Sequence, residues 1–175
     1  MPTFLVFLLG IVVGAVVVAG GVMWKGSSLV VTEHVSPSSV EETVARLTKA
    51  AEAEGWKVLG VRKLDESIKQ GAGFDVRPVH VVDLCHPAHA GKILAEDAAR
   101  PVSVFMPCTI AVYEKSDGKA YVASTNASLL GRVFGGVVAE VMGGPVAEAQ
   151  GRFVSAAHST AAPASAPAPA SAPAK

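Results

Sequence analysis

The chain opens with an apolar segment that begins at Phe4 and ends at Trp24, 21 residues without a charged side chain. A helix rises about 1.5 Å per residue, so this length matches the hydrocarbon core of a bilayer, about 30 Å thick. Trp24 and Lys25 then supply the interfacial aromatic ring and the charge that suit a membrane boundary. The pattern predicts one transmembrane anchor over residues 1–25, with the lipid bilayer as its partner.

A cleaved signal peptide is the alternative, but no Lys or Arg precedes Phe4 and the apolar run exceeds the usual length of about 7 to 15 residues. Lys25 is the only basic residue near either end of the segment, and a literal positive-inside count would place the domain in the cytoplasm. A short N-terminus, an anchor helix and a Pro/Ala tail are typical of bacterial envelope proteins. We therefore expect a single-pass protein of the cell membrane with an extracytoplasmic, periplasmic domain.

Small residues recur one helical turn apart within this segment, at Gly10 and Gly14 and again at Ala15 and Ala19. Such spacing lets two helix backbones approach closely in a membrane, although Gly and Ala are also common in single spans. Gly10 and Gly14 are therefore candidates for self-association, and a homodimer is the oligomer that we expect.

Residues 26–158 alternate between strand and helix patterns and predict a single α+β domain. Ser36 and Pro37, or Ser38 with Glu41 as a capping box, can start a first helix that Gly55 ends. Residues 65–77 are polar and predict a loop with one helical turn at most. The expected strands span residues 29–35, 57–64, 79–84, 102–114 and 119–123, and the later helices 87–100, 129–142 and 145–157.

The helix expected over residues 129–142 carries an apolar stripe beside a column of small residues, which includes Gly131 and Gly135. Arg132 and Glu140 argue against a second membrane span. A helix buried on the sheet is one interpretation, and an interfacial helix or a dimer contact is the other. Gly131 and Gly135 are therefore further self-association candidates. From residue 159 to 175 the chain is almost entirely Ala, Pro and Ser, which predicts a disordered, extended tail.

Charge and cysteine content exclude two classes of protein. Lys plus Arg and Asp plus Glu each number 15, so the net charge is zero and no positive field would attract nucleic acid. With two cysteines, a disulfide framework is excluded, although one bridge between Cys85 and Cys108 remains open.

Three short motifs carry a resemblance: Asp83-Leu-Cys-His-Pro87, Met106-Pro-Cys-Thr-Ile-Ala-Val-Tyr-Glu114 and Lys119-Ala-Tyr-Val122. They resemble the family known as domain of unknown function 302, over about residues 29–157. The resemblance implies a compact α+β domain with an antiparallel sheet and packed helices, often dimeric, and it implies no activity. Met106 and Thr109 depart from the family pattern, which has Leu and a basic or amide side chain there.

Cys85, His86, His89 and Cys108 are the one group of soft or borderline metal ligands in the sequence, so a metal ion or haem is a possible cofactor. Two inert buried thiols and a disulfide are the alternatives. Cys85, beside His86 at a helix start, also fits a thiol enzyme on paper. No phosphate-binding loop, nucleophile elbow or paired-carboxylate motif is present, and no catalytic residue is assigned.

The sequence thus predicts a membrane-anchored domain that binds a small ligand, a metal ion or haem, and it leaves open whether the domain has an enzymatic activity. A structural or assembly protein acting through self-association is the alternative, followed by a thiol-dependent enzyme.

Overall fold

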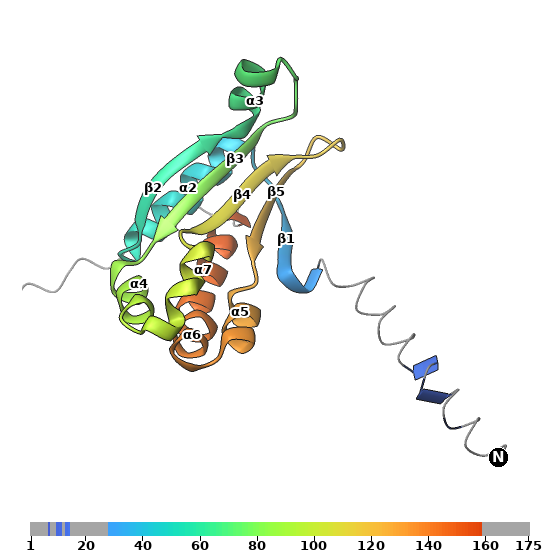
Figure 1. Ribbon diagram of the computed structural model, residues 1–175. Coiled ribbons are helices and arrows are strands. Elements are labelled where there is room, and N and C mark those ends of the chain that lie inside the picture. The colour runs from blue at the N-terminus through green and yellow to red at the C-terminus, as the bar shows by residue number, and fades with distance from the viewer. Residues whose placement is uncertain (1–6, 8–9, 12, 15–27, 159–175) are drawn as a thin grey trace, which may run out of the picture.

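The computed structural model describes residues 28–158, together with residues 7, 10, 11, 13 and 14. Within this part the chain forms one sheet with helices packed against it (Figure 1). The sheet has five strands in the order β1-β5-β4-β3-β2, and every neighbouring pair is antiparallel. The strands are β1 (Val31–Ser36), β2 (Lys57–Lys63), β3 (Val79–Cys85), β4 (Cys108–Glu114) and β5 (Ala120–Thr125).

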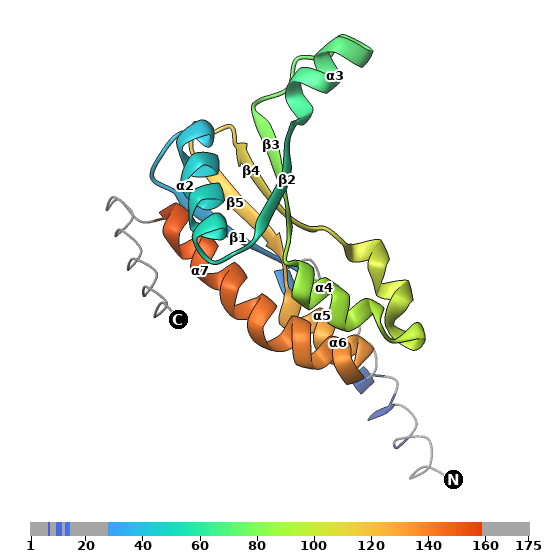
Figure 2. The ribbon, with the colours of Figure 1, turned by 90° about the vertical axis from the view of Figure 1, so that its left-hand side faces the viewer.

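One face of the sheet builds the core and the other stays open. Side chains alternate along each strand, so Val82, Ile110 and Val122 share the inner face and are fully buried. Helices α2 (Val40–Ala53) and α7 (Ala147–His158) lie against this inner face, as Figure 2 shows from the side. The remaining elements are α3 (Leu64–Ala72), α4 (Pro87–Leu94), η1 (Asp97–Phe105), α5 (Ala127–Phe134), α6 (Gly136–Val141) and η2 (Met142–Val146).

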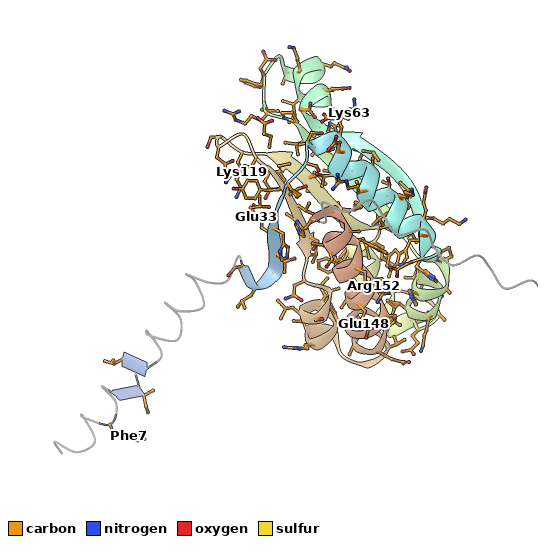
Figure 3. All side chains as sticks on the ribbon, turned by 180° about the vertical axis from the view of Figure 1, so that it is seen from behind. Phe7, Glu33, Lys63, Lys119, Glu148 and Arg152 are labelled. Carbon is orange, nitrogen blue, oxygen red and sulfur yellow. The ribbon has the colours of Figure 1, made fainter. Side chains whose placement is uncertain are left out.

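Charged side chains link α7 to the end of α2 and β1 to the end of β4; Figure 3 labels Arg152 and Glu33 among them. Arg152 of α7 donates to Glu54 at the end of α2, with Nη2 and Oε2 2.7 Å apart. On the open face Glu33 of β1 accepts from the hydroxyl of Tyr113 and, at 2.6 Å, from Nζ of Lys115. The hydrogen bonds from Lys115 and Tyr113 lower the pKa of Glu33.

The arrangement of strands and helices confirms the expected α+β class with an antiparallel sheet and packed helices.

The N-cap of the first helix lies after both predicted caps, three residues after Ser36 and one residue after Ser38. Ser39 is the N-cap of α2, and its Oγ accepts from the backbone N–H of Glu42 at 3.2 Å. Ser36 is instead buried, with its Oγ 2.7 Å from the hydroxyl of Thr43 and 3.1 Å from the carbonyl oxygen of Ala157. It therefore joins β1 to α2 and α7 and does not cap the helix.

The single helix expected over residues 129–142 is also wrong, because α5 and α6 are separate. Gly135 divides them with φ 66° and ψ −166°, a conformation that glycine alone adopts readily. The chain then turns so that Gly131 is buried against Gly143 of the same chain. The small residues thus pack within the protomer, and a contact of Gly131 or Gly135 with a second copy stays a prediction.

Three other boundaries differ from the expected ones. Residues 64–72 form α3 where a loop was expected, and α4 ends at Leu94 where Arg100 was expected. Residues 102–105, expected in a strand, belong to the 3₁₀ helix η1, and β4 begins at Cys108 after a cis Met106–Pro107 bond.

The predicted membrane segment lies almost entirely outside the described residues. Gly10 and Gly14 are among those described and are helical. Within the described part of the chain, no helix combines the length and the hydrophobicity needed to cross a bilayer. The predicted tail, residues 159–175, is also outside the described part.

Candidate functional site

Cys85, His86, His89 and Cys108 come together at the end of two neighbouring strands. Cys85 is the last residue of β3, and Leu84 is paired with Cys108 at the start of β4. His86 and His89 belong to the N-cap and first turns of α4. All four line one small cavity of about 30 Å³. We call this cavity the cysteine–histidine pocket; its other walls include Trp56, Met106 and Met142.

The local sequence explains why the two imidazoles face this cavity. Pro87 occupies the first turn of α4, where its missing N–H costs no helical hydrogen bond. His86, the N-cap, has an extended backbone, and its side chain makes no capping hydrogen bond. Its ring stacks on that of His89 with centroids 4.1 Å apart, and both rings contact Trp56 at 5.6 and 6.1 Å.

The pocket leaves one buried polar atom without a partner. Nδ1 of His86 is buried and neither accepts nor donates a hydrogen bond. Burial lowers the pKa of His89, and the neighbouring His86 and Lys92 lower it further. His89 is therefore neutral at pH 7 and has a lone pair for a proton or a metal ion.

The two thiols are free and half-buried, so this structure has no bridge between them. Burial raises the pKa of Cys108 from 9.0 to about 11, and the nearby Cys85 adds to the effect. A nucleophilic cysteine needs a lowered pKa, because only the thiolate reacts. Cys108 thus has the opposite of the environment that a thiol enzyme requires.

Slow alkylation of Cys108 is the measurable consequence. In a Cys85→Ser variant, burial remains as the main cause of the raised pKa, while the contribution of Cys85 is lost. We therefore expect iodoacetamide at pH 8 to modify folded Cys108 at least about tenfold more slowly than the urea-unfolded chain, because each unit by which the pKa is raised lowers the thiolate fraction about tenfold. Below the raised pKa the rate should grow about tenfold per pH unit and level off above about pH 11. Equal rates for folded and unfolded chains at pH 8 would contradict the assigned environment.

A conventional zinc site does not form here. Within the described residues, no three His, Cys, Asp or Glu side chains are grouped so that they could hold one ion. Structural zinc is bound by four such ligands. The cavity of about 30 Å³ is also far smaller than a haem.

A larger groove of about 430 Å³ opens on the other side of the same wall. We call it the outer groove. It shares Met106, Pro107, Cys108 and Met142 with the cysteine–histidine pocket. The remaining lining combines apolar and polar side chains, among them Arg62, Asp83, Phe105, Thr109, Thr125, Leu130 and Gln150.

The polar end of the outer groove is fixed by a bidentate ion pair. Nε and Nη2 of Arg62 donate to the two carboxylate oxygens of Asp83 at 2.7 and 2.9 Å. The hydroxyl of Thr109 donates to the same carboxylate at 3.2 Å. The hydrogen bond from Arg62 is the main cause that lowers the pKa of Asp83, so this carboxylate is ionised at neutral pH. Thr109, which departs from the family pattern, still places a polar group here.

Sequence reasoning found the four Cys and His residues but missed most of their surroundings. Trp56, Met106 and Met142 come from a turn, a loop and a helix kink, none of which carries a metal or ligand motif. Arg62 and Asp83 could have been paired only by knowing that β2 and β3 are neighbours, where Val81 lies opposite Arg62 and Gly60 opposite Asp83.

Comparison with known proteins supports the fold and the family. A crystal structure of an uncharacterized conserved protein DUF302 from Bacillus stearothermophilus is similar, with a TM-score of 0.64 and 21% sequence identity, over 74% of this chain and 98% of that one. No curated protein matches the chain significantly. The family model described as domain of unknown function DUF302 matches residues 32–157. The chain therefore belongs to the DUF302 family.

Proposed function

We propose that this protein is a membrane-tethered binding module whose DUF302 domain takes a small ligand in the outer groove. The uncharged segment from Phe4 to Trp24 would supply the tether. The domain would face the periplasm. Protease digestion of intact spheroplasts would test this orientation, because a periplasmic domain would be cleaved and a cytoplasmic domain would survive.

The observation that carries this proposal is the size and chemistry of the outer groove. Its volume of about 430 Å³ lies in the range typical of small-molecule sites, about 300 to 1,000 Å³. Phe105 and Leu130 offer apolar surface, while Thr109 and the amide of Gln150 offer hydrogen bonds. Since Arg62 and Asp83 neutralise each other, the groove suits an uncharged ligand with one apolar and one polar end.

Self-association is a second candidate function because apolar side chains of η1 and α5 are exposed. The ring of Phe105 contacts that of Phe134, and Val104 and Val133 nearby in the sequence are 78% and 68% exposed. Exposed apolar groups of this kind are typical of surfaces that bind another protein chain.

Blocking the groove should abolish binding of a fragment that fits it. We would use benzamide, which joins an apolar ring to an amide, and detect its binding to the full-length protein in detergent by saturation-transfer NMR. Thr125 ends β5 and lines the groove, so Thr125→Phe should fill it. We expect saturable binding with a Kd of about 1 mM in the wild type and no binding in Thr125→Phe.

The matched control is Ala123→Phe, on the same strand and the same sheet face but outside the groove lining. It adds the same ring and should leave benzamide binding unchanged. Binding that is absent from the wild type, or equal in all three proteins, would refute the groove as the ligand site.

A further inference from the structure

We propose that the cysteine–histidine pocket binds one soft monovalent metal ion, Cu(I) or its analogue Ag(I), through sulfur and imidazole donors. The inference builds on the proposed binding function and adds a ligand of a different class behind the wall of the outer groove. The metal ion would bind in the cysteine–histidine pocket, whereas benzamide would bind in the outer groove.

The donors of the chain are concentrated around this cavity. The whole chain has two cysteines, four methionines and five histidines. Both cysteines line the cavity of about 30 Å³, with the methionines 106 and 142 and the histidines 86 and 89. These side chains come from β3, the N-cap and first turn of α4, β4, η2 and the loop before β4. Among the described residues, no three cysteines and histidines are grouped for one ion, so a methionine sulfur is needed to complete a site.

The type of donor selects the type of ion. Thiolate and thioether sulfurs favour Cu(I), whereas Ca²⁺, Mg²⁺ and Mn²⁺ prefer carboxylate and carbonyl oxygens. No Asp or Glu lines the cavity among the described residues. Zn²⁺ needs a full set of His, Cys or carboxylate ligands, and the described residues offer no group of three. Cu(I) accepts fewer ligands, and it accepts the thioethers of Met106 and Met142.

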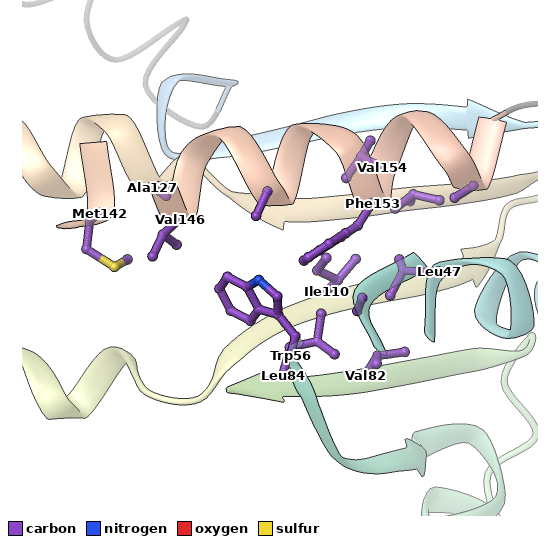
Figure 4. Close-up of a cluster of buried hydrophobic side chains, with 14 of the residues drawn as sticks. Leu47, Trp56, Val82, Leu84, Ile110, Ala127, Met142, Val146, Phe153 and Val154 are labelled. Atoms are coloured by element: carbon purple, nitrogen blue, oxygen red, sulfur yellow. The ribbon is translucent and has the colours of Figure 1, made fainter. Parts of the chain in front are cut away.

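The cavity also has a size and a largely buried wall that suit a single ion. A volume of about 30 Å³ holds one ion or a water molecule or two, but no organic ligand. Trp56 and Met142 in its wall are 4% and 6% exposed. Figure 4 shows Met142 and Val146 of η2 on the side that faces the Trp56 ring. An indole face stabilises a nearby cation, which would further favour a charged occupant.

One buried polar atom of the pocket would be satisfied by such an ion. Nδ1 of His86 is buried without a hydrogen-bond partner, which is costly unless a donor or a cation occupies the neighbouring space. Met106, Cys108 and Met142 also line the outer groove, so the cavity lies next to a surface that is open to solvent.

The test is a Cu(I) titration of the full-length protein in detergent, without oxygen, with ascorbate as reductant and bicinchoninate as competing chelator. A Trp24→Phe background leaves Trp56 as the sole tryptophan, so its fluorescence reports on the pocket. We expect one Cu(I) per chain with quenching of Trp56, weakened at least about a hundredfold by Cys108→Ser and about tenfold by Met142→Leu. Excess Zn²⁺ should not displace the ion.

Two control variants separate the pocket from other sites. Met23→Leu removes a methionine of the N-terminal apolar segment and should bind Cu(I) as the wild type does. Thr125→Phe should lose benzamide but keep Cu(I), so failure of the metal site and failure of the groove are distinguishable. Less than about a tenth of a Cu(I) per chain, or unchanged affinity in both Cys108→Ser and the nearly isosteric Met142→Leu, would overturn the inference.

Discussion

Replacing Phe153 by alanine should lower the free energy of unfolding of the domain by about 3–5 kcal/mol. Phe153 lies on α7, is 1% exposed and is the largest fully buried side chain among the described residues. Its ring meets that of Trp56 edge to face, with centroids 5.4 Å apart. The substitution removes buried apolar surface and leaves a void between α7 and the sheet, and both effects destabilise the folded state.

Urea unfolding followed by circular dichroism would measure this loss. Phe74→Ala makes the same chemical change at a ring that is 67% exposed, and it should shift the free energy of unfolding by less than about 0.5 kcal/mol. A loss below about 1 kcal/mol for Phe153→Ala would mean that α7 is not packed on the sheet as described. Because Trp56 rests on Phe153, the same variant should also loosen the cysteine–histidine pocket.

The parts of this fold that could be predicted from sequence are those with a regular apolar repeat. In α2 the buried side chains of Val40, Val44, Leu47 and Ala51 recur every three or four residues, which is the spacing of one helix face. The alternation of Cys108, Ile110 and Val112 with Thr109 and Ala111 likewise predicted the two faces of β4. In both elements the local pattern and the tertiary environment agree.

Elements without such a repeat were missed for physical reasons. Helix α3 has no buried residue, and its apolar side chains, Leu64, Ile68 and Ala72, are too few to stand out in a mostly polar segment. Val102, Val104 and Phe105 have the β-branched and aromatic side chains that favour a strand, yet they belong to η1, which also contains Pro101. Their conformation depends on contacts with distant parts of the chain, which no local pattern encodes.

The candidate site, too, could be predicted only in part from the sequence. Cys85, His86, His89 and Cys108 were identified as chemical types, and the antiparallel pairing of β3 with β4 explains why they meet. Met142 and Trp56 could not be assigned to that site, because each reaches it through a kink or turn. Met142 belongs to the irregular turn η2, where Gly144 has non-helical dihedral angles, and Trp56 follows Gly55, which has a φ of 80°.

Replacing Gly131 should give the second large effect on stability. This substitution tests whether the small residues near residue 135 pack within one chain or between two chains. A Cβ atom at Gly131 would lie 3.0 Å from the backbone nitrogen of Gly143 and 3.2 Å from Cα of Ala139. Backbone atoms cannot move aside as a flexible side chain can, so a larger residue must push α5 away from α6 and η2. Gly131→Val should therefore lower the free energy of unfolding by about 3 kcal/mol.

The matched control is Gly151→Ala, in the exposed middle of α7, where an added Cβ meets nothing within 4 Å. Alanine favours a helix over glycine, so this variant should gain up to about 1 kcal/mol. Urea unfolding and sedimentation velocity should be measured on the same samples. If Gly131→Val kept its stability and only shifted a dimer to monomers, the glycines would serve self-association. Loss of stability at every protein concentration would instead show that Gly131 is needed for close packing inside one protomer, which is what the contact with Gly143 predicts.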